Sequence, residues 1–234
     1  GANANQVLIL IDGVRVSSPT LGQTDLSDIS PEQIDRIEVI RGPQSTLYGA
    51  DAIGGVVNII TRKGSGRPFS AVVDNAFGNY DTMQNRLSAS GAYKIFDYAL
   101  SGAHFESNGQ FKNDNSDMWA GNVRLGLTLP LDSAISVVYR YNKNDTGVPI
   151  KAVFPPPQSI DPIINPNAKQ QTETTVLSVE AKSRPVEWWE SRASFGRYTS
   201  NQGLQDPPDP GLDFEVPIRS QVDVEGLESH WFNW

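Results

Sequence analysis

The stretch Val7-Leu8-Ile9-Leu10-Ile11-Asp12-Gly13 decides the fold of this chain. Five apolar residues in a row predict a strand that is buried on both faces, because a strand with one exposed face alternates apolar and polar residues. Asp12-Gly13 is a turn signal that ends the run. We therefore predict that residues 7–11 form a central strand of a small sheet.

Two further strands are predicted after this one. The first covers residues 36–41, and Gly42-Pro43 ends it because proline cannot donate a hydrogen bond to a neighbouring strand. The second covers residues 56–61. Gly54-Gly55 precedes it and lets the backbone bend or approach another strand closely.

Short helical segments are expected between these strands. Ser30 is suited to be the N-cap of a helix, Pro31 fits its first position, and Gln33 completes a capping box. A helix of about two turns would follow. The segment 43–49 is long enough for one helical turn that ends at a glycine. The sequence therefore predicts a small α+β unit at the start of the chain.

These motifs occur in an order that resembles a known family. VLILIDGVRV, followed by IDRIEVIRGPQSTLYGADAIGGVVNIITRKG, is similar to the second half of the plug domain of TonB-dependent outer-membrane receptors, and within that family to the cobalamin and siderophore receptors. The match covers about a quarter of the chain. It implies that residues 1–64 are the C-terminal part of a plug domain. In the family, a short box that recruits the energy-transducing TonB protein lies further upstream, and we expect this box to be missing from this chain.

Composition and charge exclude several other classes of protein. The 234 residues carry a formal net charge of -8, and no basic run or recognition-helix pattern is present, so nucleic acid is not an expected partner. Cysteine is absent, which excludes disulfides and thiolate metal sites. No apolar run approaches the ~18 residues of a transmembrane helix. A transmembrane β-strand has only ~10 residues and needs apolar side chains on one face only.

Beyond residue 68 the hydrophobic pattern changes to a period of two. The clearest case is Val123, Leu125, Leu127 and Leu129, which alternate with Arg124, Gly126 and Thr128. Eight strands are predicted in this way, at 69–80, 82–93, 97–108, 118–129, 134–143, 173–183, 187–200 and 219–232. The last strand loses its alternation near Gly226, where we expect a β-bulge.

The connections between these strands favour an outer-membrane barrel over a soluble sandwich. Links on one edge are short, whereas those on the other edge include the segments 109–117, 144–172 and 201–218. Outer-membrane barrels have short periplasmic turns and long outer loops. Aromatic residues are expected near the strand ends, where they would form girdles at the lipid interfaces: Tyr93, Tyr98, Trp119, Tyr139, Tyr141, Trp188 and Trp189.

The two parts of the chain together predict an incomplete barrel. A closed eight-stranded barrel is filled by its own side chains and cannot hold a plug, whereas 22-stranded transporters have a plugged lumen. We therefore predict that residues 69–234 are the first part of a transmembrane β-barrel, an open curved sheet of about eight antiparallel up-and-down strands with the plug segment on its concave, polar face. The open edges and the lipid-facing apolar band predict poor solubility for the isolated chain.

The resemblance also implies which residues bind a ligand. In cobalamin-type receptors the loop after the strand that ends in Asp-Gly lies at the outward apex of the plug and touches the ligand. The matching residues here are Arg15, Val16, Ser17, Ser18, Pro19, Thr20, Leu21, Gly22 and Gln23. A solvated turn is the alternative for this segment. The long outer loops would close over the ligand.

A contact between plug and barrel is implied at Arg36, Glu38 and Arg41. In the family, the arginine before Gly-Pro pairs with glutamates on the barrel wall, and Arg41 occupies that position. The planar guanidinium suits this role because it can bind carboxylates through two parallel hydrogen bonds. A local ion pair of Arg41 with Glu38 or Asp35, or simple exposure, remains an alternative.

Enzyme and metal chemistry have little support in the sequence. His104 and His230 lie far apart, neither is part of a nucleophile-elbow pattern, and phosphate-binding signatures are absent, so no catalytic residue and no cofactor are expected. Asp114 and Asp117 are weak candidates for calcium ligands, since they lie in the loop where cobalamin receptors bind calcium. This loop lacks the glycine and the distal glutamate of an EF-hand, which favours a solvated polar turn.

The sequence and the resemblance together lead to one functional hypothesis. We expect an outer-membrane receptor that binds a scarce solute, such as a siderophore-bound iron or a cobalamin, and admits it when TonB rearranges the plug. Expected partners are therefore TonB, a small-molecule ligand such as a metal chelate, and outer-membrane lipid. A soluble β-rich ligand-binding protein is the alternative.

Overall fold

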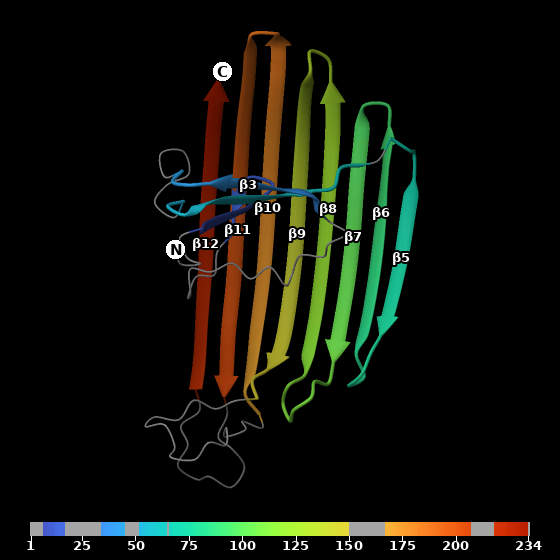
Figure 1. Cartoon of the computed structure of the whole chain (residues 1–234), viewed down its shortest axis with the longest axis vertical. Helices are drawn as coiled ribbons and strands as arrows, with labels where there is room; N and C mark the ends of the chain where they lie inside the picture. The colour runs from blue at the N-terminus through green and yellow to red at the C-terminus, as the bar shows by residue number, and fades with distance from the viewer. Residues whose placement is uncertain are drawn as a thin grey trace.

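The structure, a computed structural model, describes residues 7–16, 34–44, 52–64, 66–149, 167–206 and, for the backbone alone, 218–233. These residues form two sheets. The large sheet has eight strands in the order β12-β11-β10-β9-β8-β7-β6-β5, and each strand pairs antiparallel with its neighbour along the chain (Figure 1). This confirms the predicted open, up-and-down sheet. Its strands are β5 (Ser70–Phe77), β6 (Met83–Tyr93), β7 (Phe96–Ser107), β8 (Ser116–Leu129), β9 (Ser133–Gly147), β10 (Lys169–Val186), β11 (Trp189–Asp206) and β12 (Ile218–Asn233).

The small sheet comes from the start of the chain. It contains β1 (Val7–Ile11), β2 (Val14–Arg15), β3 (Ile34–Arg41) and β4 (Gly55–Thr61), in the order β2-β1-β4-β3. β1 pairs parallel with β4 and antiparallel with β2, so it is the central strand that its apolar sequence predicts. The two-residue strand β2 was not predicted, because the residues after Asp12-Gly13 give no strand pattern of their own.

A close backbone approach occurs at Gly55, as the Gly54-Gly55 pair suggests. The residue has a φ of +144°, which is accessible to glycine and strained for other residues. A Cβ at this position would lie 2.6 Å from the carbonyl oxygen of Ile40 on the neighbouring strand β3. Glycine is therefore required for β3 and β4 to pair at this end.

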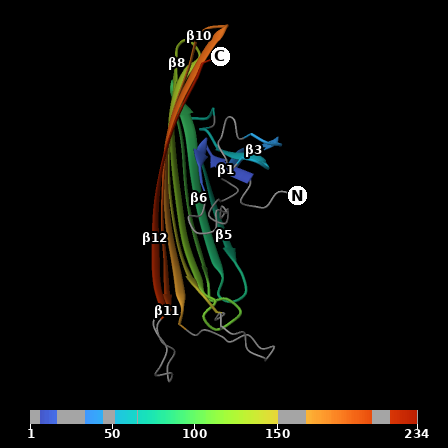
Figure 2. The same ribbon diagram turned by 90° about the vertical axis from the view of Figure 1, so that its left-hand side faces the viewer.

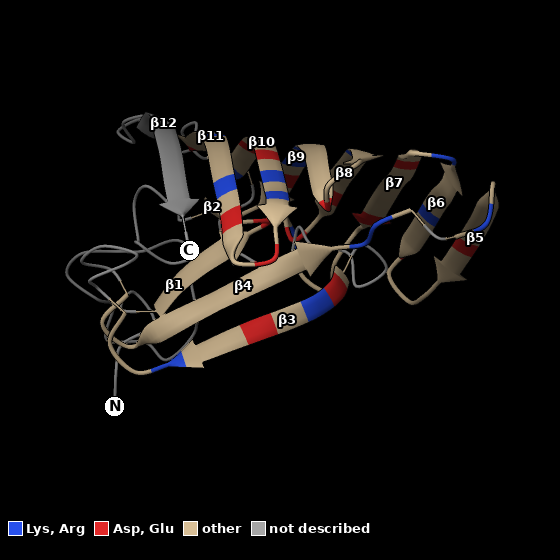
Figure 3. Cartoon of the chain, turned by 90° about the horizontal axis from the view of Figure 1, so that it is seen from above, with Lys and Arg blue, Asp and Glu red and all other residues tan. Residues whose placement is uncertain are grey.

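The small sheet lies against one face of the large sheet. Seen from the side, the large sheet is curved, and β1 and β3 lie on the side toward which it bends (Figure 2). The strands of the small sheet cross those of the large sheet (Figure 1). Seen from above, β3 is the strand farthest from the large sheet (Figure 3). We call the face of the large sheet that carries the small sheet the inner face, and the opposite face the outer face.

The two faces differ sharply in chemistry. On the outer face of β6 to β11, large apolar side chains are exposed, among them Leu87, Leu100, Trp119, Val123, Leu125, Leu127, Ile135, Tyr139 and Phe195. The alternate residues of the same strands point to the inner face, where polar side chains are buried: Asn122, Arg124, Arg140, Asn142, Ser178 and Ser200. The period of two therefore separates an apolar outer face from a polar inner face, as predicted.

Connections between neighbouring strands are short on one edge of the large sheet. Lys94-Ile95 joins β6 to β7, residues 130–132 join β8 to β9, and Glu187-Trp188 joins β10 to β11. Lys94, Leu131 and Asp132 have positive φ angles, which tight turns of this kind require. We call this the turn edge, and the opposite one the loop edge.

The strands near the loop edge are longer than predicted. β9 and β10 continue to the pair Gly147 and Lys169, and β11 continues to Asp206. The predicted boundaries of the loops at 144–172 and 201–218 are therefore wrong, because strand residues occupy part of each segment. Their polar residues obscure the alternation, but strand pairing uses backbone hydrogen bonds and does not need apolar side chains.

Two smaller predictions about the large sheet are also wrong. The pairing of β11 with β12 continues through Tyr198 and Gly226 without a shift, so no bulge occurs there. The irregularity lies between Ser183 and Val186 on β10. Tyr139 and Tyr141 lie well inside β9 rather than near its end, because that strand continues to Gly147.

The helix of about two turns predicted after Ser30 is wrong in its length, because strand β3 begins at Ile34. The helical segment predicted at 43–49 lies largely outside the described residues. Within the described part of the chain, no helix has the length and apolar character needed to cross a membrane.

Candidate functional site

A rigid turn at the end of β1 is the centre of the small sheet. Asp12 and Gly13 both have positive φ angles, of 49° and 79°. The carboxylate of Asp12 accepts two hydrogen bonds from Thr61, one from the backbone N–H at 2.9 Å and one from the hydroxyl at 2.7 Å. Gly13 N–H donates to the side chain of Asn58 at 3.3 Å. The turn is thus fixed to the end of β4, and Thr61 is buried.

The same turn contacts the inner face of the large sheet. The hydroxyl of Ser178 on β10 donates to the carbonyl oxygen of Asp12 at 3.3 Å. Val14 packs against Gly196 on β11, where a Cβ would lie 2.7 Å from a methyl carbon of Val14. These contacts join segments more than 160 residues apart in the sequence, and sequence patterns gave no signal for them.

An apolar cluster surrounds this contact and joins the two sheets. Its buried members are Ile11, Val14, Val16 and Ile59 from the small sheet region and Val176 from β10, with Tyr198 of β11 packed against them. Burial of apolar surface contributes about 25 cal/mol per Å². Within the described residues, apolar packing and the hydrogen bond from Ser178 both hold the small sheet on the inner face.

The ligand-binding segment implied by the resemblance is only partly described. Arg15 is half-buried on β2, and Val16 is 5% exposed within the apolar cluster. The side chain of Val16 therefore packs between the sheets. The residues Ser17, Ser18, Pro19, Thr20, Leu21, Gly22 and Gln23 lie outside the described part of the chain.

The implied contact residues lie on β3, the strand farthest from the large sheet, where Figure 3 shows alternating basic and acidic segments. Arg36 donates to Glu38 at 2.8 Å and to Asp35 at 3.0 Å, and all three side chains are about half exposed. The hydrogen bond to Glu38 is the main cause that raises the pKa of Arg36. Arg41 is exposed and has no ion pair within the described residues.

The two calcium candidates have different hydrogen-bond partners. Asp114 accepts a hydrogen bond from the backbone N–H of Gln110 at 3.2 Å, whereas Asp117 contacts the Nε2 atom of His104 at 3.1 Å. The imidazole of His104 also stacks on Trp119, with ring centroids 3.9 Å apart. Within the described residues, no three His, Asp or Glu side chains are grouped as metal ligands would be.

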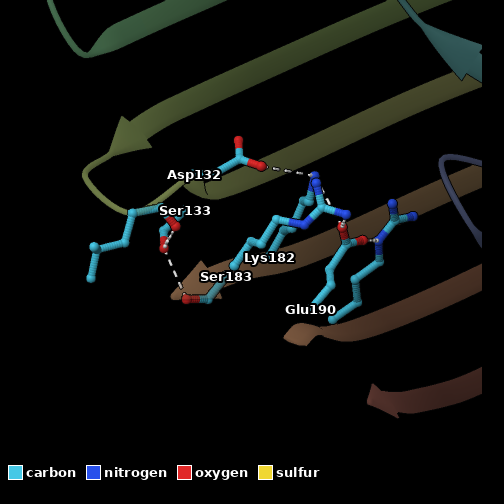
Figure 4. Close-up of polar contacts among 8 residues, drawn as sticks. Asp132, Ser133, Lys182, Ser183 and Glu190 are labelled. Atoms are coloured by element: carbon cyan, nitrogen blue, oxygen red, sulfur yellow. Dashed lines mark hydrogen bonds and ion pairs between the residues drawn. The ribbon is translucent and has the colours of Figure 1, made fainter. Parts of the chain in front are cut away.

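A charged cluster near the turn edge was not anticipated from the sequence. Figure 4 shows Glu190 of β11 among the cationic groups of β10 and β11. Its carboxylate accepts from Arg192 at 2.7 Å and lies 3.6 Å from Lys182 and 3.5 Å from Arg184. Lys182 also lies 3.8 Å from Asp132, in the turn between β8 and β9. The hydrogen bond from Arg192 and the nearby positive charges lower the pKa of Glu190.

The Glu190 cluster links β10 and β11 to the turn between β8 and β9 at the turn edge. Beside it, the hydroxyls of Ser133 and Ser183 lie 2.9 Å apart and link β9 to β10. We call Asp132, Lys182, Arg184, Glu190 and Arg192 the rim cluster. Each of its three cations, Lys182, Arg184 and Arg192, lies within ion-pair distance of the Glu190 carboxylate.

Comparison with known families assigns the start of the chain. Residues 1–56 match the family model described as TonB-dependent receptor plug domain. This stretch contains β1, β2, β3 and the beginning of β4. The match therefore covers most of the small sheet. Proteins that carry this domain are receptors and transporters rather than enzymes.

Solved structures of similar fold include both sheets. The copper transporter OprC has a TM-score of 0.75 at 19% identity, and the match covers 97% of this chain and 35% of that one. The siderophore receptor PirA from Acinetobacter baumannii has a TM-score of 0.72 at 18% identity, with 97% and 37% covered. The ferric yersiniabactin uptake receptor FyuA from Yersinia pestis has a TM-score of 0.70 at 17% identity, with 97% and 37% covered.

The chain thus spans little more than a third of the length of these structures. The small sheet corresponds to the plug of such receptors, and the large sheet has the fold of part of their barrel. Residues 1–56 are thus similar to the plug domain of TonB-dependent receptors, and the chain as a whole has the fold of part of the plug and part of the barrel of such receptors.

Proposed function

We propose that this chain is part of an outer-membrane receptor that binds a scarce metal or metal chelate on the outer side and admits it when the plug rearranges. One observation carries this proposal. A plug segment lies on the polar inner face of a curved sheet whose outer face exposes Leu125, Leu127, Tyr139 and other apolar residues. Lipid would cover the outer face, and the inner face would line a plugged lumen.

The orientation in the membrane follows from the two edges of the large sheet. Short turns lie on the periplasmic side of outer-membrane barrels and long loops on the outer side. The turn edge, with Lys94-Ile95 and Glu187-Trp188, is therefore periplasmic. The loop edge would face the outside and contribute to ligand capture.

The proposed ligand site is the segment from Arg15 to Gln23, in which the buried side chain of Val16 would anchor the segment and not touch the ligand. It leaves the rigid Asp12-Gly13 turn, whose position is fixed by Thr61 and Ser178. A binding segment attached to a rigid support loses less conformational entropy when it binds a ligand. The similar structures include a copper transporter, a siderophore receptor and a ferric yersiniabactin uptake receptor. A metal ion or metal chelate is accordingly the proposed class of ligand, with cobalamin as the alternative implied by the plug sequence.

Contacts between the plug and the rest of the barrel are proposed at β3. Arg36, Glu38 and Arg41 are exposed on the strand farthest from the large sheet. Ile37 and Val39 on the same strand are 54% and 59% exposed. A closed barrel would bring its remaining wall near this strand, and carboxylates on that wall would pair with Arg41.

Energy for the rearrangement is proposed to come from TonB, which would pull on the plug from the periplasmic side. Within the described residues, the plug contacts the inner face through one apolar cluster and the hydrogen bond from Ser178. Local opening of such a unit requires less free energy than unfolding of the large sheet with its continuous strand pairing.

An uptake assay in cells tests the proposal. The complete reading frame that contains this chain would be expressed in an outer-membrane-bearing host that lacks its own metal-chelate receptors. Accumulation of ⁵⁵Fe-labelled ferric siderophores, of copper and of radiolabelled cyanocobalamin would be measured with and without TonB. TonB-dependent uptake of one of these probes is the expected result. Recovery of the protein in the soluble fraction would contradict the proposal and favour a soluble binding protein.

A further inference from the structure

The segment that leaves the plug is bound closely to the wall of the large sheet. It connects β4 to β5 and runs along the turn-edge ends of β6 and β7. The backbone N–H of Ala92 donates to the carbonyl oxygen of Arg67 at 2.8 Å, and the hydroxyl of Tyr98 donates to the carbonyl oxygen of Pro68 at 3.2 Å. We call residues 62–69 the exit segment; all of them except residue 65 are described.

One carboxylate holds the exit segment at its plug end. The backbone N–H of Gly64 donates to Oδ1 of Asp97 on β7 at 3.3 Å. The same oxygen accepts from Nη1 of Arg124 on β8 at 2.6 Å. The side chains of Arg124 and Asp97 are 8% and 21% exposed, so solvent screens this pair little. Arg124 thus fixes the carboxylate to which Gly64 binds.

Three glycines make this approach sterically possible. A Cβ at Gly64 would collide with the carbonyl oxygen of Gly91 and would lie 2.8 Å from the backbone nitrogen of Tyr98. A Cβ at Gly91 would in turn collide with the carbonyl oxygen of Pro68, and a Cβ at Gly126 with the carboxylate of Asp97. The exit segment therefore fits a slot in the wall with no room for a side chain at these three positions.

The plug end of the exit segment is also fixed to the plug itself. Thr61 is 1% exposed and bound to Asp12, and Nε of Arg62 donates to the carbonyl oxygen of Ile34 at 3.0 Å. Gly64 follows two residues later. A displacement of the exit segment at Gly64 would therefore be transmitted directly to β4 and to the Asp12-Gly13 turn.

The largely buried ion pair between Asp97 and Arg124 is not well explained by a contribution to stability alone. Desolvation of two charges offsets much of their attraction, and apolar residues of similar size often stabilise a protein as well or better. A carboxylate fixed by arginine does, however, provide an acceptor at a defined place for a backbone N–H. Asp97 can therefore fix the position of the backbone at Gly64.

We propose that Asp97, fixed by Arg124, is a positioning residue that holds the exit segment at Gly64 on the barrel wall and so sets the place of the plug in the lumen. This inference rests on the proposed function, because it concerns a plug that must close the lumen between uptake events. Loss of the anchor would let the plug shift. The lumen would then admit solutes that the intact receptor excludes, and ligand uptake would fall.

The test uses the complete receptor in outer membranes and two kinds of variant. Asp97→Asn removes the charge and keeps the side-chain volume. Gly64→Ala keeps both charged groups, Asp97 and Arg124, but fills the slot. Hydrogen exchange of the peptide that covers residues 62–68 should be at least about tenfold faster in both variants, since a hydrogen bond to a charged group is lost or displaced. Entry of vancomycin into the cells should rise, and uptake of the transported probe should fall.

Asp74→Asn is the matched control. Asp74 lies 3.8 Å from Arg86 on the neighbouring strand pair β5 and β6, is exposed and does not contact the exit segment. This variant should leave exchange, vancomycin entry and uptake unchanged. Exchange of β8 and β9 peptides and resistance of the folded protein to unheated SDS would show that the barrel remains intact in each variant.

Two outcomes would overturn the proposal. If residues 62–68 exchange hydrogen at the same rate in Asp97→Asn as in the Asp74→Asn control, Asp97 does not hold the exit segment. Faster exchange with unchanged vancomycin entry and uptake would reduce Asp97 to a structural role. If the unaltered receptor took up none of the probes, the proposed function would fail, while the exchange and vancomycin measurements would still decide whether Asp97 positions the plug.

Discussion

Val14 of the plug packs directly on Gly196 of the barrel wall, where a Cβ on the glycine would lie 2.7 Å from a Val14 methyl carbon. This contact explains why a residue without a side chain is needed in the middle of β11. Gly196 is paired with Ser178, whose hydroxyl donates to Asp12 in the same plug turn. The contact therefore determines how closely the plug approaches the wall.

Replacing Gly196 should loosen the plug. In Gly196→Val, the added carbons would overlap Val14, and overpacking of this kind costs about 1–3 kcal/mol. We expect plug peptides to exchange hydrogen about tenfold faster while the strands of the barrel stay protected. Gly102→Val is the control, because the nearest atom to a Cβ there is 3.9 Å away. Equal exchange in both variants would show that Gly196 does not limit the approach of the plug.

Asp12 should be essential for the shape of the plug. Asp12→Ala would remove both hydrogen bonds to Thr61 and would place alanine at a φ of +49°. Because hydrogen bonds to charged groups contribute ~1.5–3 kcal/mol each, a loss of at least about 2 kcal/mol in plug stability is expected. Thr61→Val removes the hydroxyl donor alone and should cost about half as much. Denaturant titration followed by plug proteolysis would measure the difference. A smaller loss in Asp12→Ala than in Thr61→Val would contradict this assignment.

The rim cluster should weaken in acid. The pKa of Glu190 is lowered in the folded protein, mainly by its hydrogen bond from Arg192. A group with a depressed folded pKa contributes stability that is complete above its ordinary pKa and is lost as the pH falls through the folded value. The loss should therefore begin below about pH 4.5. Protection of the amides at the turn between β10 and β11, corrected for the intrinsic exchange rate at each pH, should fall there, and Glu190→Gln should remove this pH dependence. An unchanged profile in Glu190→Gln would refute the assignment.

Leu125 should tolerate apolar replacements and reject a charge. It lies on the outer face of β8 and is 41% exposed in this chain. If lipid covers this face, Leu125→Arg should cost about 2–4 kcal/mol at mid-membrane depth, whereas Leu125→Phe should be nearly neutral. Recovery of folded protein in outer membranes would compare the two. Equal recovery would place this face in water.

Much of the architecture could be predicted because each strand carries its own local signal. Val7–Ile11 is uniformly apolar and is central, and residues 123–129 alternate and have two distinct faces. Where polar residues occupy both faces, as in Asn144 and Asp145 of β9, the signal is lost although the pairing continues. Strand existence was therefore predictable, and strand ends near the loop edge were not.

The contacts between plug and barrel could not be predicted from the sequence. Gly64 and Asp97 are 33 residues apart, and Asp12 and Ser178 are 166 apart. Neither pair belongs to a motif, because a glycine that leaves room and a carboxylate that accepts an N–H look like ordinary turn and surface residues. The resemblance implied Arg36, Glu38 and Arg41 as contact residues, and the described structure shows Arg36 paired locally with Asp35 and Glu38.

The central claim is that the outer face of the large sheet contacts lipid and the inner face contacts the plug. A spin-label scan along β8 tests this claim most directly. This chain contains no cysteine, so single cysteines at positions 119 to 127 can be labelled one at a time in the complete receptor in lipid. We expect oxygen, which concentrates in lipid, to relax labels at 119, 123, 125 and 127, and labels at 122 and 124 to be immobile and shielded. Labels at the odd positions that respond to a water-soluble relaxant instead, or that show no alternation, would contradict the account.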